Sequence, residues 1–152
     1  MRQTSSADAA ESSVFDALFR PRSIAIVGIS GKELSLAARP MRYLQRSGFA
    51  GLLYPVNPNY DELGGLKCYS SLEAIETSID LVLSMVPAAG VIDVLRSAGR
   101  VGARAMVVFA SGFAETGPEG LALQEQLTQA ARETNVRVLG PNCQGLINNE
   151  LG

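Results

Sequence analysis

The chain has 152 residues, of which 47% are hydrophobic and 18% charged, so it can bury one core and has the size of a single domain. Its formal net charge of −2 comes from 13 basic and 15 acidic residues, with neither sign concentrated enough to attract a polyanion, which argues against a nucleic-acid binder. Histidine is absent, which excludes His-dependent triads, histidine general bases and most zinc chemistry within this chain.

The cysteine spacing and the lengths of the apolar runs indicate the cellular compartment of the protein. Cys68 and Cys143 lie far apart in the sequence, which matches neither a CxxC redox pair nor a structural zinc site. The longest apolar run, 81–92, is interrupted by Ser84 and Pro87 and is shorter than the ~20 residues of a membrane span. The N-terminal stretch lacks the apolar region of a signal peptide. We therefore expect a reduced protein in the cytoplasm, without membrane contact.

The first residues differ in composition from the rest. Residues 1–13 have too few apolar side chains to offset the entropy of ordering them, which predicts a disordered leader before a domain at 14–152. Residues 14–19 carry apolar side chains at helical spacing ahead of Pro21, which predicts one or two helical turns lying on a sheet.

Five short apolar runs rich in β-branched residues follow, separated by glycine, proline and amphipathic stretches. The runs are apolar on both faces, as expected of strands covered by helices on both sides. The predicted strands are 24–27, 52–56, 81–86, 105–109 and 136–139.

Amphipathic stretches between the runs predict helices. Tyr43 and Leu44 are expected to face the core from the first of them, and Leu121 from the last. A short helix in between is expected to be capped by Ser70 or Ser71. The predicted helices are 41–47, 71–75, 90–101 and 119–133.

This alternation of strands and helices predicts a fold. It implies right-handed βαβ crossovers and a Rossmann-like three-layer α/β/α sandwich with a mainly parallel five-stranded sheet. Ligands of such sheets bind beyond the carboxyl ends of the strands, at the point where the strand order reverses. The residues just after each apolar run are therefore the candidate site.

The loops after the first and second predicted strands indicate which nucleotide the protein could bind. Gly28, Ser30, Gly31 and Lys32 form a small-residue loop whose backbone N–H groups suit a phosphate. The glycines do not form GxGxxG, so a tight turn without a ligand is the alternative. Asn57 stands where a dinucleotide site has an acidic residue for the ribose, so NAD is the less favoured nucleotide.

Each remaining loop has two interpretations. The proline-rich loop after the second strand is either a rigid connector or a ligand wall. Val86 and Pro87 suit a flat ring or close packing, and Ser111 suits a ligand oxygen or a simple turn. A nucleophilic Cys143 would need a basic partner, so we expect this residue to line a pocket or fill the core.

Taken together, the loops resemble the CoA-binding domain of the NDP-forming acyl-CoA synthetases, relatives of the succinyl-CoA synthetase α subunit. The set follows the family's order and spacing from about residue 14 to the end, and it is more specific than any one motif. The matching stretches are LFRPRSIAIVGIS at 18–30, YPVNP at 54–58, VPA at 86–88, SGF at 111–113 and GPNCQG at 140–145.

The resemblance implies a site for coenzyme A across the strand ends. In such a site the first loop faces the phosphates, the second and third flank the adenosine, the fourth contacts the pantetheine, and the last lies near the thiol. The residues so assigned are Gly28, Ser30, Gly31, Lys32, Arg39, Pro40, Asn57, Pro58, Val86, Pro87, Phe109, Ala110, Ser111, Gly112, Asn142 and Cys143.

The sequence departs from the family at two positions. Many relatives have lysine where this chain has Asn59, so either one phosphate contact is missing or it is supplied by Lys32, Arg39 or Arg42. The loop before the first long helix carries Arg39 and Pro40 in place of a glycine, a form that resembles members acting on aromatic or other less common acids.

The family's phosphate carrier is a histidine in a following domain, and a nucleotide-binding grasp domain supplies the phosphate. This chain has no histidine, so we expect a domain of a longer protein that binds CoA without turnover and needs those domains, or a subunit that carries them, as partners. One alternative is a non-enzymatic CoA sensor, alone or fused to an acetyltransferase. Another is an NAD-binding oxidoreductase domain. The absence of an acidic residue after the second predicted strand, and of a third glycine in the loop after the first, argues against it.

Overall fold

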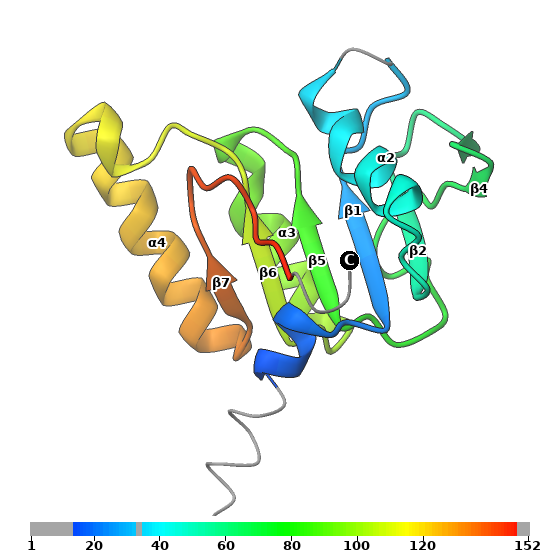
Figure 1. Cartoon of the computed structure of the whole chain (residues 1–152). Coiled ribbons are helices and arrows are strands. Elements are labelled where there is room, and N and C mark those ends of the chain that lie inside the picture. The colour runs from blue at the N-terminus through cyan, green and yellow to red at the C-terminus, as the bar shows by residue number, and fades with distance from the viewer. Residues whose placement is uncertain (1–13, 33–34, 149–152) are drawn as a thin grey trace, which may run out of the picture.

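A five-stranded sheet runs through the centre of the protein, whose computed structural model describes residues 14–32 and 35–148 (Figure 1). Its strand order is β2-β1-β5-β6-β7, and all neighbouring strands are parallel. The fold and the five predicted strands are confirmed, although β5 and β6 end earlier than predicted. The strands are β1 (Ser23–Val27), β2 (Leu52–Val56), β5 (Leu81–Ser84), β6 (Ala105–Val108) and β7 (Arg137–Leu139).

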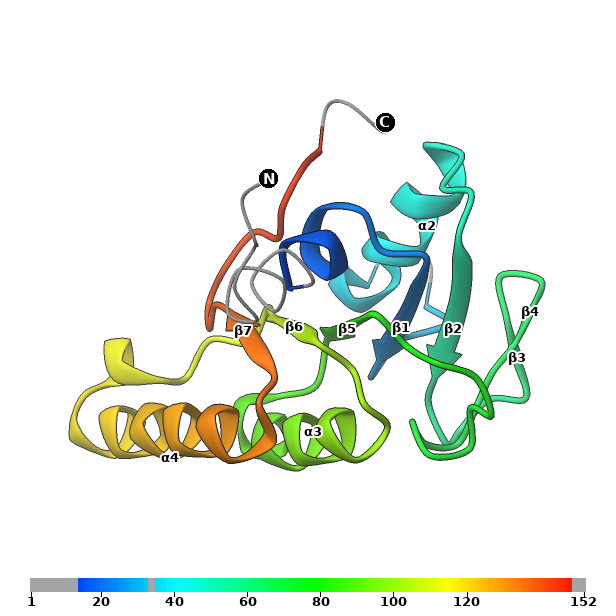
Figure 2. The same ribbon diagram turned by 90° about the horizontal axis from the view of Figure 1, so that it is seen from below.

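Helices cover both faces of the sheet. Figure 2 shows α3 and α4 on one face, and α2 with the helical residues 14–19 on the other. These four helices confirm predictions, whereas the predicted leader 1–13 lies outside the described residues. The bounds are α2 (Arg39–Arg46), α3 (Ala88–Arg100) and α4 (Pro118–Thr134), with short 3-10 turns η1 (Leu36–Ala38) and η2 (Ala114–Thr116).

The alternation of side chains along each strand divides the core in two. Val82 and Met106 point toward α3 and α4, where Leu95 and Phe113 are fully buried. The next residue along each of these strands, such as Leu83, points toward residues 14–19 and α2. Strand residues are therefore apolar at consecutive positions because each position is buried on one side or the other.

Three local predictions were wrong. Residues 71–75 form a turn with a hydrogen bond from the Ile75 amide to the Leu72 carbonyl rather than a helix. Tyr43 is 58% exposed, because α2 turns Met41 and the partly buried Leu44 inward. Leu121 is 49% exposed, because it lies beside the buried stripe of α4 rather than on it.

A small hairpin was missed. Strands β3 (Glu62–Leu63) and β4 (Leu66–Lys67) pair antiparallel around Gly64 and Gly65. Two-residue strands are too short to show alternation, and the Gly-Gly pair was the only local sign of the turn. Beyond the hairpin, Tyr69 forms an isolated bridge with Val56 and so attaches this segment to the end of β2.

Two buried serines offer a matched test of how hydrogen bonding affects stability. Ser84 is fully buried on β5, and its hydroxyl has no hydrogen-bond partner among the described residues. The Ser23 hydroxyl, in contrast, donates to the Ser78 carbonyl and accepts from the Asp80 amide, each at 2.9 Å.

We expect Ser84→Ala to raise the free energy of unfolding by about 1 kcal/mol, because it removes an unsatisfied buried group. Ser23→Ala is expected to lower it by about 1–2 kcal/mol, because the two hydrogen bonds of this buried hydroxyl, to the Ser78 carbonyl and from the Asp80 amide, are lost. Urea denaturation of both variants checks this. Equal losses in the two variants would contradict the assignment of Ser84 as unpartnered.

Candidate functional site

The strand order reverses beside β1. The chain passes from β1 to its neighbour β2 and then crosses back to β5 on the other side, so the connections after β1 and β5 lead to helices on opposite faces of the sheet (Figure 2). A groove of about 480 Å³ opens there, a size that suits a small-molecule ligand. Four residues predicted for the site line it together: Gly28, Asn57, Pro58 and Val86.

Gly28 brings the first and third loops into contact. Its amide donates to the Val56 carbonyl at 3.0 Å, and its φ of +80° lies in the left-handed region that glycine adopts most easily. A Cβ at this position would lie 2.7 Å from Val86 Cγ1 and 3.0 Å from the Val86 nitrogen. The groove therefore depends on a residue without a side chain at this point.

Asn57 shapes the opposite wall. Its Nδ2 donates to the Ile29 carbonyl at 2.7 Å, and its Oδ1 accepts from the Asn59 amide at 2.9 Å. The Cys68 thiol donates to the Asn57 carbonyl at 3.5 Å, and burial raises the pKa of that thiol. Both ends of the Asn57 amide are thus used inside the protein, which positions this residue as a brace between two loops.

The predicted phosphate loop lies at the same edge but outside the groove lining. Ser30 Oγ accepts from the Lys32 amide at 3.1 Å, and the Lys32 carbonyl accepts from the Ser35 amide at 2.9 Å. Lys32 and Arg39 have exposed side chains, and Arg39 with Pro40 begins α2. The structure therefore separates the cationic side chains of this loop from the groove.

The loop after β6 meets the start of α3. A Cβ at Gly112 would lie 3.2 Å from the Ala88 Cβ, while Phe113 is fully buried beneath the loop. The Gly112 amide donates to Glu115 Oε1 at 2.7 Å, and this bond lowers the pKa of the Glu115 carboxyl. A ligand oxygen would have to replace Glu115 at that amide, whereas the Ser111 side chain is exposed.

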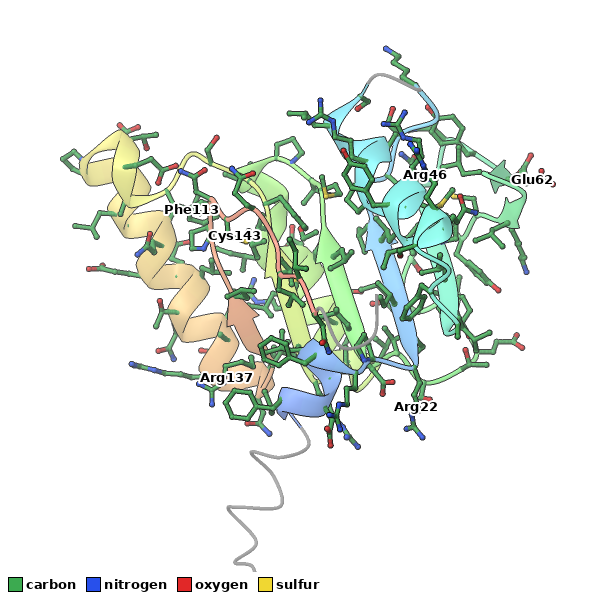
Figure 3. All side chains as sticks on the ribbon, viewed as in Figure 1. Arg22, Arg46, Glu62, Phe113, Arg137 and Cys143 are labelled. Carbon is green, nitrogen blue, oxygen red and sulfur yellow. The ribbon has the colours of Figure 1, made fainter. Side chains whose placement is uncertain are left out.

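The last motif crosses the end of β6. The Asn142 amide donates to the Ala110 carbonyl at 2.9 Å, and the Cys143 thiol donates to the Val108 carbonyl at 3.4 Å. Figure 3 shows Cys143 at the carboxyl edge of the sheet. Cys143 also packs against the core beside Phe109, which favours the core and pocket-lining role over a nucleophile.

The groove also contains residues that the sequence analysis missed. Asp93, Ser97 and Arg100 line it from α3, and Ser70 and Ser71 line it from the turn after β4. The α3 residues stand at i, i+4 and i+7, a polar face that was overlooked because only the apolar stripe was considered. No group of three or more acidic, cysteine or histidine side chains in residues 14–32 and 35–148 could hold a metal ion.

Glu73 ties α3 to the turn. Its Oε1 accepts from Ser97 Oγ at 2.6 Å and from Arg100 Nη2 and Nε at 2.7 and 3.1 Å. The bond from Ser97, with smaller contributions from the backbone and Arg100, lowers the pKa of Glu73 to about 2. The carboxylate is therefore charged at neutral pH and holds Arg100 against the groove.

Comparison of the sequence with known proteins identifies the family and its relatives. A family model described as a CoA binding domain matches residues 22–149. An ADP-forming acetate–CoA ligase of Methanocaldococcus jannaschii is 37% identical over 86% of this chain, which spans 18% of that relative. The α subunit of ADP-forming acetate–CoA ligase II of Pyrococcus furiosus is 34% identical over 89% of this chain, which spans 29% of it.

Solved structures show the same architecture. An acetyl-coenzyme A synthetase of Ca. Korarchaeum cryptofilum, solved with phosphate and ADP, matches with a TM-score of 0.86 at 36% identity, over 90% of this chain and 29% of that one. A hypothetical protein from Pyrococcus horikoshii matches with a TM-score of 0.68 at 26% identity, over 94% of this chain and 93% of that one. The domain thus has similar counterparts in larger proteins and in a chain of its own size.

Proposed function

The chain belongs to the CoA-binding domain family, and from this premise we propose that it holds coenzyme A for the acyl-transfer step of an ADP-forming acyl-CoA synthetase. The observation that carries the proposal is the groove at the strand-order reversal, where Gly28, Asn57, Pro58 and Val86 meet. The chain spans about a fifth of the M. jannaschii ligase, at 18% of its length, so the ligase activity is that of a larger assembly.

In this proposal, the adenosine lies in the groove between Pro58 and Val86. The diphosphate passes the loop that contains Ser30, Gly31 and Lys32, whose small residues allow close approach to backbone N–H groups. The pantetheine crosses the ends of β5 and β6 and brings the thiol toward Asn142. Each of these positions lies on the carboxyl edge of the sheet.

The chemical role of the domain is orientation of the thiol. In the reaction, the CoA sulfur attacks the carbonyl carbon of an acyl phosphate, so that a C–S bond forms as the C–O bond to phosphate breaks, and the thiol proton ends on the departing phosphate. Holding the thiol in line with that carbon can supply up to ~7–11 kcal/mol of the barrier reduction. The domain performs this step without a nucleophile of its own.

Partners must supply the rest of the reaction. The chain contains no histidine, so the phosphorylated histidine and the nucleotide-binding grasp domain of our proposal belong to further domains or another subunit. An α subunit among the relatives supports an assembly of this kind. No helix in the described part of the chain has the length and hydropathy of a membrane-spanning segment. The cytoplasmic location stays a prediction.

A CoA-sensing module without catalysis is the second candidate. The P. horikoshii protein matches this chain over 93% of its own length, so a domain of this size occurs outside a large ligase. The gene sequence beyond residue 152 separates the two candidates. A grasp domain with a histidine-bearing partner supports the ligase, whereas an acetyltransferase domain supports regulated acylation.

Calorimetric titration of the purified chain with CoA and NAD tests the binding site. We expect saturable CoA binding and none for NAD, with affinity for CoA lowered several-fold in Lys32→Ala and in Ser111→Ala. Lys67→Ala is the control, because this other lysine lies on β4 with its ammonium 4.8 Å from the centre of the Tyr69 ring. Unchanged affinity for CoA in both site variants, or tighter binding of NAD than of CoA, would contradict the assignment.

A further inference from the structure

The outer edge of β7 is open. Among the described strands, β7 pairs only with β6. The Arg137 amide donates to the Arg104 carbonyl at 2.9 Å, on the side of β6. Because hydrogen-bonding directions alternate along a strand, the amide and carbonyl of the next residue, Val138, face away from β6. An extended chain placed beside β7 would therefore meet an unpaired donor and an unpaired acceptor.

The opposite edge of the sheet, at β2, is covered by the protein itself. Pro55 has no N–H group to offer on that edge, and its carbonyl accepts from the Tyr69 amide at 2.9 Å. The Tyr69 carbonyl in turn accepts from the Asn57 amide at 2.9 Å. No backbone segment in residues 14–32 and 35–148 pairs in this way with the outer edge of β7. The two edges of the sheet therefore differ.

A groove of about 430 Å³ follows the open edge of β7. Leu127 and Ala131 line it from α4, Val136 lines it beside β7, and Val14 lines it from the other face of the sheet. Phe15, the neighbour of Val14, is 58% exposed. A strand added to β7 would therefore find apolar side chains on both faces of the sheet.

The charged side chains of this groove have one sign. Arg132 and Arg137 line it, and no acidic side chain of the described residues does so. Both arginines are exposed, and neither has an ion pair with a described residue. The neighbouring acids, Asp16, Glu125 and Glu133, lie outside the lining, and Glu133 accepts from a glutamine one turn earlier at 2.9 Å. The groove therefore favours an acidic ligand.

The two arginines lie on different faces of the sheet. Arg132 belongs to α4, which covers one face. Leu139 packs into the core on the other face, and Arg137, two residues earlier on β7, shares that direction. Since side chains of an added strand also alternate between the faces, acidic residues at both odd and even positions would reach both cations.

We propose that the edge of β7 binds an extended acidic segment of a partner protein, which joins the sheet as a sixth strand. The segment is held by main-chain hydrogen bonds to Val138 and by ion pairs with Arg132 and Arg137. This inference goes beyond the proposed function, because the two grooves share no lining residue. It adds a surface through which the domain attaches to another protein.

The charges favour a different protein over a second copy of this chain. An exposed charge such as Arg137 on an edge strand prevents sheets from joining edge to edge. Two copies that met at β7 would bring Arg132 and Arg137 of both grooves together, and like charges on neighbouring strands repel. An acidic strand meets the opposite charge at both positions.

The test uses a blocked acidic peptide, Glu-Glu-Val-Thr-Val-Glu-Glu, and NMR of the isotope-labelled chain. We expect the Val138 amide to exchange rapidly with solvent in the chain alone and about tenfold or more slowly with the peptide bound. Joint substitution Arg132→Glu and Arg137→Glu should weaken the peptide by about tenfold or more. Arg46→Glu, on α2 and far from Arg137 in Figure 3, is the control and should bind normally.

Val138→Pro tests the main-chain contact. It removes the N–H group that faces away from β6 and leaves the bonds to β6 in place, as proline does on an edge strand. We expect this variant to lose the peptide and to keep its affinity for CoA. Thermal unfolding verifies that it is folded, and the double arginine variant tests the proposal without changing the backbone.

The remaining outcomes would overturn the proposal. These are absence of peptide binding, equal binding of a peptide with lysine in place of each glutamate, and unchanged binding in the double arginine variant. A Val138 amide protected in the chain alone would show a segment of the same chain on the edge, and protection that rises with concentration would show a second copy. Loss of CoA binding with intact peptide binding would refute the proposed function alone.

Discussion

Gly28→Ala is expected to abolish CoA binding and to lower the free energy of unfolding by about 2–4 kcal/mol, the sum of a left-handed backbone and an overpacked contact. The new Cβ would lie 2.7 Å from Val86 Cγ1, 3.0 Å from the Val86 nitrogen and 3.1 Å from the Met85 carbonyl carbon. The last two are backbone atoms at the end of β5, which has strands on both sides. Relief therefore requires the loops after β1 and β5 to separate, and this change would deform the groove.

Gly102→Ala is the matched control for Gly28. Gly102 has a similar φ of +75°, but a Cβ there would have no neighbour within 4 Å. We expect this variant to lose only about 1–2 kcal/mol, from backbone strain alone, and to bind CoA normally. Denaturant unfolding and CoA titration of both variants provide the measurement. Equal losses of stability, or intact CoA binding in Gly28→Ala, would show that the contact with Val86 is unimportant.

Gly120→Ala is expected to cost about 3 kcal/mol or more, because the substitution forces a helix and a loop apart. A Cβ at Gly120, on the first turn of α4, would overlap the Phe113 carbonyl oxygen and Thr116 Oγ1 and lie 2.6 Å from the Phe113 carbonyl carbon. Thr116 Oγ1 donates to that carbonyl at 2.9 Å, so η2 is packed tightly on α4. Displacing it would also withdraw Phe113 from the core and weaken CoA binding through the neighbouring loop.

Gly90→Ala provides the control for a helical glycine without such a contact. Gly90 lies on the first turn of α3, and its Cβ would meet Val86 Cγ2 at 3.4 Å, an ordinary van der Waals distance. Alanine in a helix is favoured over glycine by about 0.5–1 kcal/mol, so this variant should be slightly more stable than the natural chain. Thermal and urea unfolding measure both effects, and a Gly120→Ala variant as stable as Gly90→Ala would refute the packing argument.

Much of the architecture could be predicted from local patterns. Runs such as 24–27 and 105–109 are apolar at successive positions because their strands are covered on both faces, and this requirement is visible in the sequence itself. The stripes of α3 and α4 follow from helical periodicity in the same way. The strand-end loops carried enough of the family's motifs to indicate CoA, and the family match at 22–149 confirms that prediction.

Side-chain direction was less predictable where a helix is short or its start uncertain. In α2, the inward direction predicted for Leu44 is confirmed, but Met41 rather than Tyr43 is the other residue on its inner face. The segment 71–75 has helix-like residues, but it forms a turn in which Glu73 accepts hydrogen bonds from Ser97 and Arg100 of α3. Tertiary partners decided both cases.

The sequence by itself therefore determined the order of strands and helices, the burial of the sheet and the family to which the domain belongs, since each depends on patterns within short stretches. Only the tertiary structure decided which residues share the groove. Glu73 meets Arg100, Gly28 meets Val86 and Gly120 meets Phe113 through the path of the chain, and no local periodicity encodes these contacts. Packing of distant segments, rather than local propensity, therefore brought these residues together.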